Sequence, residues 1–189
     1  GLPARWLVYA GLIVALLSPI IFHQVLAEHQ RNRIRIFLNP SSDTTRSGWN
    51  ARQSLLAVGS GGLSGKGFMN GTQNTLGYLP RNVSHTDFIF SVIAEETGFV
   101  GSTAVIVLEL LILLLSVYIA SQACDEFGRN VACGIAVMFC CHVYINIGMT
   151  VGMAPIIGIP LPFVSSGGSF MLLTMSCIGI LQSIYIRRR

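Results

Sequence analysis

The sequence predicts an all-α polytopic membrane protein with about four transmembrane helices. Only 11% of the 189 residues are charged and 52% are hydrophobic, whereas roughly a quarter of the residues in soluble domains are charged. The apolar residues lie in runs of about 20, the length that crosses the hydrocarbon core of a bilayer. These runs lack the polar face of a helix on the surface of a soluble protein, which argues against a soluble helical bundle.

The individual elements follow from the order of apolar and polar segments. Four apolar runs predict four spans, and the segments between them are predicted to be connections. The last connection is apolar but contains three prolines, so it cannot be a straight helix and must pack against protein or line a cavity. The predicted spans are 1–27, 99–120, 131–153 and 168–189, the last with a basic end, and the predicted connections are 28–98, 121–130 and 154–167.

Charge counting does not decide the direction of the spans. The connection 28–98 carries more basic residues than the opposite side, but the positive-inside rule is weak for long connections, and three arginines directly follow the last span. The chain begins at Gly1 and enters a span without the charged n-region and cleavage site of a signal peptide. We therefore expect it to be the C-terminal part of a longer protein.

The run "GSGGLSGKGF" at 59–68 looks like a phosphate-binding loop. It fails the P-loop pattern twice, because Ser60 stands at the first glycine position and Gly67 follows the lysine. The dinucleotide pattern GxGxxG fails as well, so nucleotide binding is excluded. Backbone N–H groups of such a loop could still bind an anion, with Lys66 adding a charge. The alternative is a flexible surface loop.

Several motifs in the same order resemble one known family. They are "GSGGLSGKG" with "GTQ", then "HTDFIFSVIAEETGFVG", then "GMAPIIGIPLPFVSSGGS". From about Arg31 to the C-terminus the chain resembles the SEDS proteins (shape, elongation, division and sporulation), and the RodA branch more than FtsW. The resemblance implies a peptidoglycan glycosyltransferase that polymerises lipid II for cell elongation and rod shape. It also implies a location in the bacterial cytoplasmic membrane. Residues 28–98 would then form one long extracytoplasmic loop that includes an interfacial helix and carries the site.

The resemblance implies that Asp87, in the His-Thr-Asp-Phe motif, is the catalytic residue. A carboxylate in hydrogen-bond reach could take the proton of the acceptor sugar hydroxyl, and cations would stabilise the leaving undecaprenyl pyrophosphate. The alternative for Asp87 is a helix N-cap. Candidate substrate-binding residues are Arg52, Gln53, Lys66, Gln73, His85 and Thr86, and candidate supporting residues are Glu95, Glu96, Ser165, Gly167 and Gly168.

Other polar residues depart from the family or lie within spans. Arg81 stands where the family has the glutamate of Leu-Pro-Glu, followed by two additional residues before His85, and Ser166 replaces a tyrosine. Glu109 is expected to be protonated or paired inside the bundle. His142 and Asn146 are expected to form hydrogen bonds between helices.

The resemblance also implies partners. These are lipid II, a class B penicillin-binding protein, other cell-wall elongation machinery and membrane lipid, with no nucleic acid. No cofactor is certain, although a divalent cation such as Mg²⁺ or Mn²⁺ could assist the pyrophosphate. Two alternative functions stay open: a lipid II flippase or transporter, which needs a polar path through the spans, and an inactive fragment.

Overall fold

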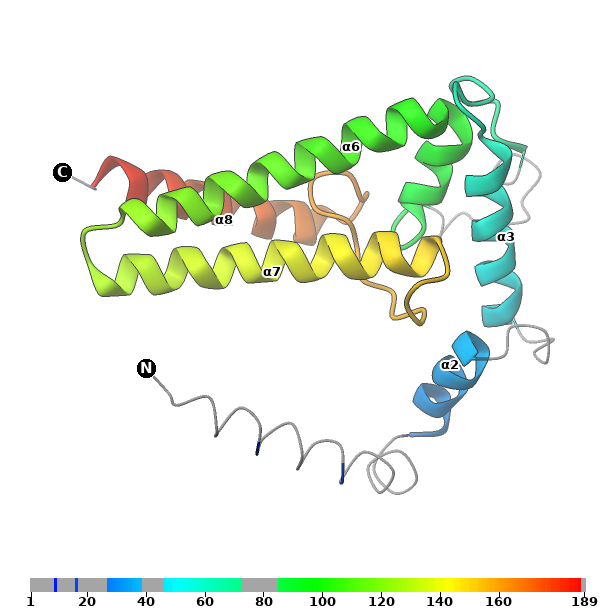
Figure 1. The fold of residues 1–189 in the computed structure, drawn as a ribbon, viewed down its shortest axis with the longest axis horizontal. Coiled ribbons are helices and arrows are strands. Elements are labelled where there is room, and N and C mark those ends of the chain that lie inside the picture. Colours follow the sequence, from blue (N-terminus) through cyan, green and yellow to red (C-terminus); the bar gives the residue numbers. More distant parts are fainter. Residues whose placement is uncertain (1–8, 10–15, 17–26, 39–45, 73–84, 188–189) are drawn as a thin grey trace.

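The fold is all-α, as predicted (Figure 1). The computed structural model describes residues 9, 16, 27–38, 46–72 and 85–187, and their regular secondary structure is helical. The first predicted span, 1–27, lies almost wholly outside the described residues. The elements are α2 (Glu28–Leu38), α3 (Arg46–Ser60), α6 (Ile89–Gln122), α7 (Glu126–Thr150) and α8 (Gly168–Ile186).

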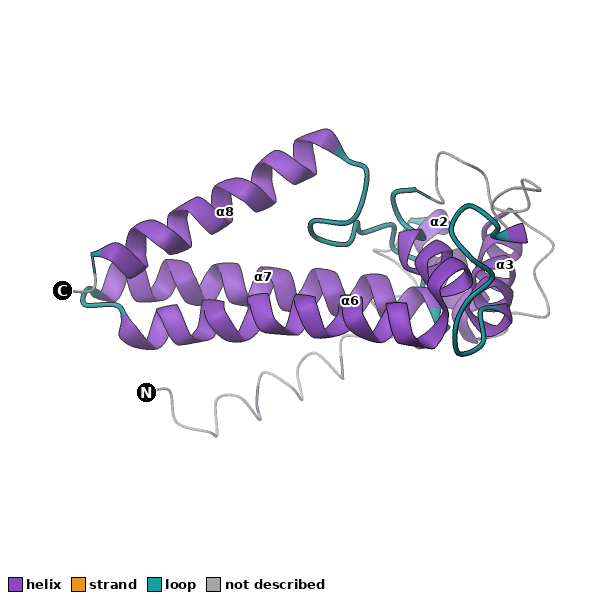
Figure 2. Ribbon diagram, turned by 90° about the horizontal axis from the view of Figure 1, so that it is seen from above, coloured by secondary structure: helices purple, strands orange, loops and turns teal. Residues whose placement is uncertain are grey.

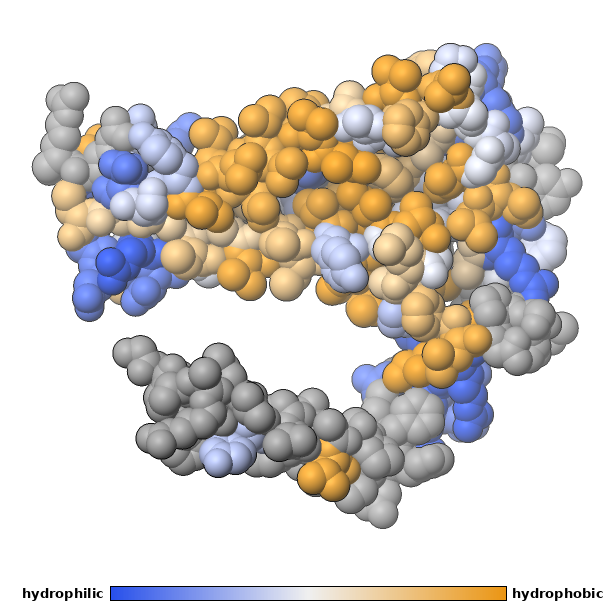
Figure 3. Space-filling view, viewed as in Figure 1, coloured by the Kyte–Doolittle hydropathy of each residue, from blue (hydrophilic) through white to orange (hydrophobic). Residues whose placement is uncertain are grey.

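Three of these helices, α6, α7 and α8, are long and apolar enough to cross a membrane. Figure 3 shows an apolar surface over the middle of these helices and hydrophilic residues toward both ends. Large apolar side chains such as Leu108, Leu115 and Leu172 are exposed on this surface. Such an arrangement is unfavourable in water and favourable in lipid, so we treat the chain as an integral membrane protein.

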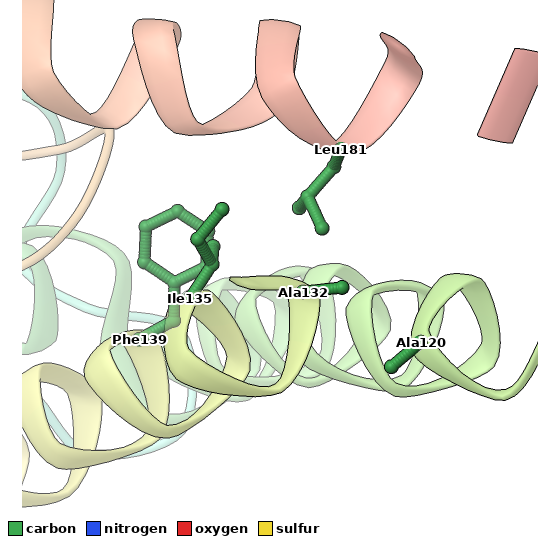
Figure 4. Packing of buried hydrophobic residues seen from close by; sticks show 5 residues of the cluster. All are labelled: Ala120, Ala132, Ile135, Phe139 and Leu181. Carbon is green, nitrogen blue, oxygen red and sulfur yellow. The ribbon is translucent and has the colours of Figure 1, made fainter. Parts of the chain in front are cut away.

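The three helices pack most closely near the turn between α6 and α7. The side chain of Asp125 ends this turn by accepting a hydrogen bond of 2.7 Å from the backbone N–H of Gly128, which caps α7. Two alanines in the contact let the helices approach closely. The C-terminal part of α8 lies near α6 and α7, and its N-terminal part is farther from them (Figure 2). The buried cluster in Figure 4 consists of Ala120, Ala132, Ile135, Phe139 and Leu181.

The expected long loop at 28–98 is not confirmed, because its described parts are mostly helical. They form α2, α3 and the first part of α6. Although the sequence of α3 is mostly polar, one side of the helix is buried, and Ser54 and Ala57 on it are inaccessible to solvent. The Ser54 hydroxyl lies 2.6 Å from the hydroxyl of Ser91 and donates to the backbone carbonyl of Thr150 at 3.1 Å. Contacts with α6 and α7 therefore stabilise a helix whose composition suggested a loop.

α6 consists of two arms separated by a sharp break. Gly98 has φ 68° and ψ −161°, which no helix contains. The short arm, residues 89–97, turns away from the long arm, residues 99–122 (Figure 1). Because the short arm begins two residues after Asp87, the break decides where that carboxylate lies relative to the long helices.

Candidate functional site

The glycine-rich run fills the break in α6. A helix end leaves backbone donors or acceptors without intrahelical partners, and here the run satisfies both broken ends. The N–H groups of Lys66 and Gly67 donate to the last carbonyls of the short arm, and the first N–H groups of the long arm donate to carbonyls of the run. The bonds are Lys66 N to Glu95 O and Gly67 N to Glu96 O (both 3.0 Å), Phe99 N to Gly62 O (2.9 Å) and Val100 N to Leu63 O (3.2 Å).

Close backbone contact explains the glycines of this run. A Cβ atom at Gly61 would fall on the carbonyl oxygen of Ala94, and one at Gly65 would fall on that of Glu96. A Cβ atom at Gly98 would meet the backbone nitrogen of Gly65. Only residues without a side chain can pack backbone on backbone in this way. The N–H groups of Lys66 and Gly67, which an anion nest would need, are already bonded to the helix.

The Lys66 side chain neutralises a buried carboxylate. Its ammonium lies 2.7 Å from Glu95 Oε1 and 2.8 Å from the Thr72 hydroxyl, which itself donates to Glu95 Oε1 at 2.9 Å. Glu95 is completely buried, whereas the Lys66 side chain is 28% exposed. The pair thus joins the glycine-rich run to the short arm. A contact between Lys66 and pyrophosphate stays a prediction.

The two partners of this ion pair are expected to differ in their importance for stability. Lys66→Met leaves the inaccessible Glu95 carboxylate without its cation and should cost about 3 kcal/mol. Glu95→Gln leaves a lysine that water can reach and keeps a hydrogen-bond acceptor, and should cost about 1 kcal/mol. Thermal unfolding of the complete protein in detergent measures both. An equal loss in the two variants would contradict this asymmetry.

The His85-Thr86-Asp87 segment is held by its backbone. Each of its three carbonyl groups accepts a hydrogen bond from a residue distant in sequence, contributed by α7 or by the connection before α8. The donors are Ser166 to His85 O (N at 3.1 Å and Oγ at 2.9 Å), Ser165 Oγ to Thr86 O (2.8 Å) and Asn146 Nδ2 to Asp87 O (2.9 Å). The backbone of the motif is therefore fixed in place.

The proline-containing connection is attached to α7 by the two polar residues of that helix. Asn146 Nδ2 also donates to the carbonyl of Ile159 at 2.7 Å, and His142 Nδ1 lies 3.2 Å from the carbonyl of Pro160. The His142 ring stacks on Phe170 with centroids 4.9 Å apart. The expectation that His142 and Asn146 join helices through hydrogen bonds is therefore wrong. Proline and the irregular backbone leave carbonyls free in this connection, and the two side chains satisfy them.

The Asp87 carboxylate lies against Gly158 of this connection. A Cβ atom at Gly158 would be 3.0 Å from Asp87 Oδ2, and Gly158 has φ 82°. Among the described residues none donates a hydrogen bond to the carboxylate, which is partly exposed. The N-cap of α6 is Phe88, so the alternative of Asp87 as the helix cap is wrong. Asp87 is thus a positioned carboxylate with free acceptor capacity.

The other predicted residues fall into separate groups. Ser165 is buried beside the motif, and Gly167 and Gly168 begin α8. Gln53 is buried in α3, whereas Arg52 on the same helix is exposed. Glu96 is partly buried and its carbonyl caps the break. Gln73 and Arg81 lie outside the described residues. Glu95 lies about 12 Å along α6 from the level of Asp87, so the Lys66–Glu95 pair is separate from the Asp87 carboxylate.

Sequence reasoning missed the positions that support Asp87. Asn146 was visible as a polar residue in an apolar run but was assigned to contacts between helices. Gly158 was one of several glycines in an irregular segment, and no local pattern distinguished it. In the part of the chain that the structure describes, no group of three His, Cys, Asp or Glu side chains gathers to bind a metal. A divalent cation bound with help from the substrate stays a prediction.

Comparison with known proteins found a family model and relatives that match nearly the whole chain. A family model described as "Cell cycle protein", for FtsW, RodA and SpoVE, matches residues 2–189. The peptidoglycan glycosyltransferase MrdB of Escherichia coli (strain K12) is 41% identical over 189 residues, which are 100% of this chain and 50% of MrdB. The peptidoglycan glycosyltransferase RodA of Treponema pallidum (strain Nichols) is 41% identical over 97% of this chain and 42% of RodA.

A solved structure agrees with these relatives. It comes from work on the structural coordination of polymerization and crosslinking by a peptidoglycan synthase complex. The match has a TM-score of 0.79 at 30% identity and covers 100% of this chain and 51% of the other. The chain therefore spans about half the length of the relatives it matches.

Proposed function

Because the chain belongs to the FtsW, RodA and SpoVE family of cell cycle proteins, we propose that it carries the catalytic aspartate of a peptidoglycan glycosyltransferase that polymerises lipid II. The relatives named as such enzymes match along the whole chain. Within the chain, one observation carries the proposal: the Asp87 carboxylate is free of described hydrogen-bond donors while its own backbone is held by Asn146. A general base requires a backbone that is held in place and a carboxylate that can accept a proton.

In the proposed reaction Asp87 accepts the proton of the acceptor sugar hydroxyl. The resulting oxygen nucleophile bonds to the anomeric carbon of the donor. The bond between that carbon and the pyrophosphate oxygen breaks, and its electron pair leaves with undecaprenyl pyrophosphate. Pyrophosphate is a good leaving group, so one base can suffice where glycosidases use two carboxylates. The hydrogen bonds to His85, Thr86 and Asp87 hold the base in one geometry, which limits the entropy lost on reaching the transition state.

The location and partners are part of the same proposal. We place the end of the molecule that carries Asp87 outside the bacterial cytoplasmic membrane, where the disaccharide of lipid II would reach it. The solved relative belongs to a synthase complex that coordinates polymerization with crosslinking. A class B penicillin-binding protein, which cross-links strands, is the corresponding partner for this chain. Other elongation proteins would bind the assembled pair.

A lipid II transporter is the second candidate, and the described spans favour it less. Glu109 is 5% exposed and borders a cavity of about 330 Å³ between α6 and α7 whose other walls are apolar. His142 and Asn146 are bonded to carbonyls of the connection before α8. These residues therefore do not form a polar path through the described helices.

The deciding experiment uses the complete protein with its cross-linking partner in liposomes containing fluorescent lipid II. A polymerase converts lipid II into long glycan strands that a muramidase digests. If the reconstituted protein moved lipid II across the bilayer and made no strands, the transporter would replace the polymerase. Running the assay with lipid II on both leaflets keeps transport from limiting strand formation.

Gly158→Ala is expected to lower strand formation at least about tenfold, because the new methyl group would displace Asp87 from its position. The substitution also strains a backbone with φ 82° by about 1–2 kcal/mol. Gly62→Ala is the matched control, since Gly62 has φ 58° and open space around it. Both variants should lose similar stability in thermal unfolding, and only Gly158→Ala should lose activity. Equal activity in the two variants would refute this contact.

A further inference from the structure

A small pocket lies where α2, α3 and the connection after α7 meet. Figure 1 shows this connection descending from the end of α7 toward α2 and α3. The pocket has a volume of about 90 Å³ and is bordered by Arg33 of α2 and Arg52 of α3. Its other walls are apolar and include Ile36, Leu55 and Ile156. Two arginines thus border a cavity whose other walls are hydrophobic.

The pocket and the Asp87 carboxylate share one short backbone segment. Arg33 Nη1 donates a hydrogen bond of 2.8 Å to the carbonyl of Ile157. At the next residue, Gly158, an added Cβ atom would lie 3.0 Å from Asp87 Oδ2. The carbonyl of the residue after it, Ile159, is bonded to the same Asn146 side chain that holds the Asp87 carbonyl. Arg33 is therefore bonded to the residue directly before Gly158, and the pocket that it shares with Arg52 borders the same connection.

The walls of the pocket define the chemistry of its ligand. Guanidinium groups bind phosphate oxygens through paired, charge-assisted hydrogen bonds. Apolar walls contribute nothing to a free sugar phosphate or nucleotide but favour a hydrocarbon chain. The volume of about 90 Å³ accommodates a head group rather than a long chain. The combination fits a phosphate ester at the point where it joins a hydrocarbon.

We infer that Arg33 and Arg52 bind the pyrophosphate of the polyprenyl substrate and stabilise it as it leaves. This inference rests on the proposed function, since that reaction releases a prenyl pyrophosphate beside Asp87. Negative charge develops on the leaving oxygen as its bond to the sugar breaks, and fixed cations lower the free energy of that state. Lys66 cannot serve in the same way without giving up part of its bonding to Glu95 and Thr72.

The same chemistry could come from the head group of an anionic phospholipid, so the test compares the two ligands. The complete protein is placed in nanodiscs of phosphatidylcholine, and the dissociation constant of undecaprenyl pyrophosphate is measured by native mass spectrometry. Arg33→Gln and Arg52→Gln should each weaken binding about tenfold or more. Arg35→Gln, on the exposed surface of the same helix and outside the pocket wall, should leave binding within about twofold. Phosphatidylglycerol at equal concentration should not displace the pyrophosphate.

Two results would overturn the inference. One is unchanged binding in both Arg33→Gln and Arg52→Gln. The other is equal competition by phosphatidylglycerol, which would make the pocket a site for bulk lipid. Arg33→Gln also loses the bond to Ile157 and Arg52→Gln does not, so a loss of affinity in both variants cannot come from that bond alone. Arg33→Lys keeps a charge and a donor and should recover part of the affinity.

Kinetics separates this inference from the proposed function. Asp87→Asn should leave the dissociation constant of the pyrophosphate within about twofold while slowing strand formation by about 10²- to 10⁴-fold, because Asp87 acts on the acceptor. Arg52→Gln should instead lower both binding and kcat/KM for lipid II. A wild-type protein that makes no strands would refute the proposed function. A wild-type protein that makes strands, with arginine variants that bind and react normally, would refute only the arginine site.

Discussion

Asp87→Asn in the complete protein should slow lipid II polymerisation by about 10²- to 10⁴-fold, the contribution typical of a general base. Asparagine has nearly the same size as aspartate but cannot accept the proton of the acceptor hydroxyl. The carboxylate has no hydrogen-bond donor among the described residues, and the bond from Asn146 goes to the backbone of residue 87. The variant should therefore keep the wild-type unfolding temperature. Initial rates of strand formation from fluorescent lipid II measure the loss.

A matched control for this substitution exists at the turn between α6 and α7. Asp125→Asn makes the same chemical change at the N-cap of α7, where the side chain accepts a hydrogen bond from Gly128. Asparagine and aspartate cap helices about equally well, so stability and activity should both change little. If Asp87→Asn kept more than about a tenth of the wild-type rate, proton transfer to Asp87 could not be the main contribution of this residue.

Gly98→Ala should have the largest effect on stability, about 3 kcal/mol or more. Its backbone, with φ 68° and ψ −161°, is open almost only to glycine. A Cβ atom there would also meet the backbone of Gly65 and Leu63, which cannot move aside without breaking the bonds that close the two arms of α6. Domains are stable by only about 5–15 kcal/mol, so this loss is a large fraction of the total.

The Gly98→Ala effect is measured by thermal unfolding and by the monodisperse fraction in detergent. Gly62→Ala serves as the control, because Gly62 lies in the same run with φ 58° but has no atom within 4 Å of the added methyl. The control should lose only the strain of its backbone, about 1–2 kcal/mol. Equal stability of the two variants would show that the run does not pack into the break as described. Gly98→Ala should also reduce polymerisation, because the break orients the short arm that follows Asp87.

The fold class could be predicted from the sequence because a membrane span depends on the hydropathy of consecutive residues. A span needs a continuous apolar run, and α6, α7 and α8 each contain one. The helices α2 and α3 could not be predicted in the same way. Ser54 and Ala57 are buried only because α3 meets α6 and α7, and a polar helix that depends on such contacts resembles a loop in composition.

Recognition of the family depended on motif order, and this too is carried by the sequence. The match over residues 2–189 confirms it. The motif containing Asp87 could be found in this way, and its chemical role follows from the properties of a carboxylate. The residues that hold it could not. Asn146, Ser165 and Ser166 lie 59 or more positions away in the chain and bond to backbone atoms, which every residue type possesses.

By itself, the sequence determined the helical membrane class, the family and the aspartate proposed as the base. The tertiary structure decided what "GSGGLSGKGF" does: its N–H groups and carbonyls close the broken ends of α6, and Lys66 neutralises the buried Glu95. It also brought Arg33 to Ile157 across 124 positions. The physical reason is that hydropathy and motifs are properties of neighbouring residues, whereas the partner of a buried charge or backbone group is chosen only when distant segments meet.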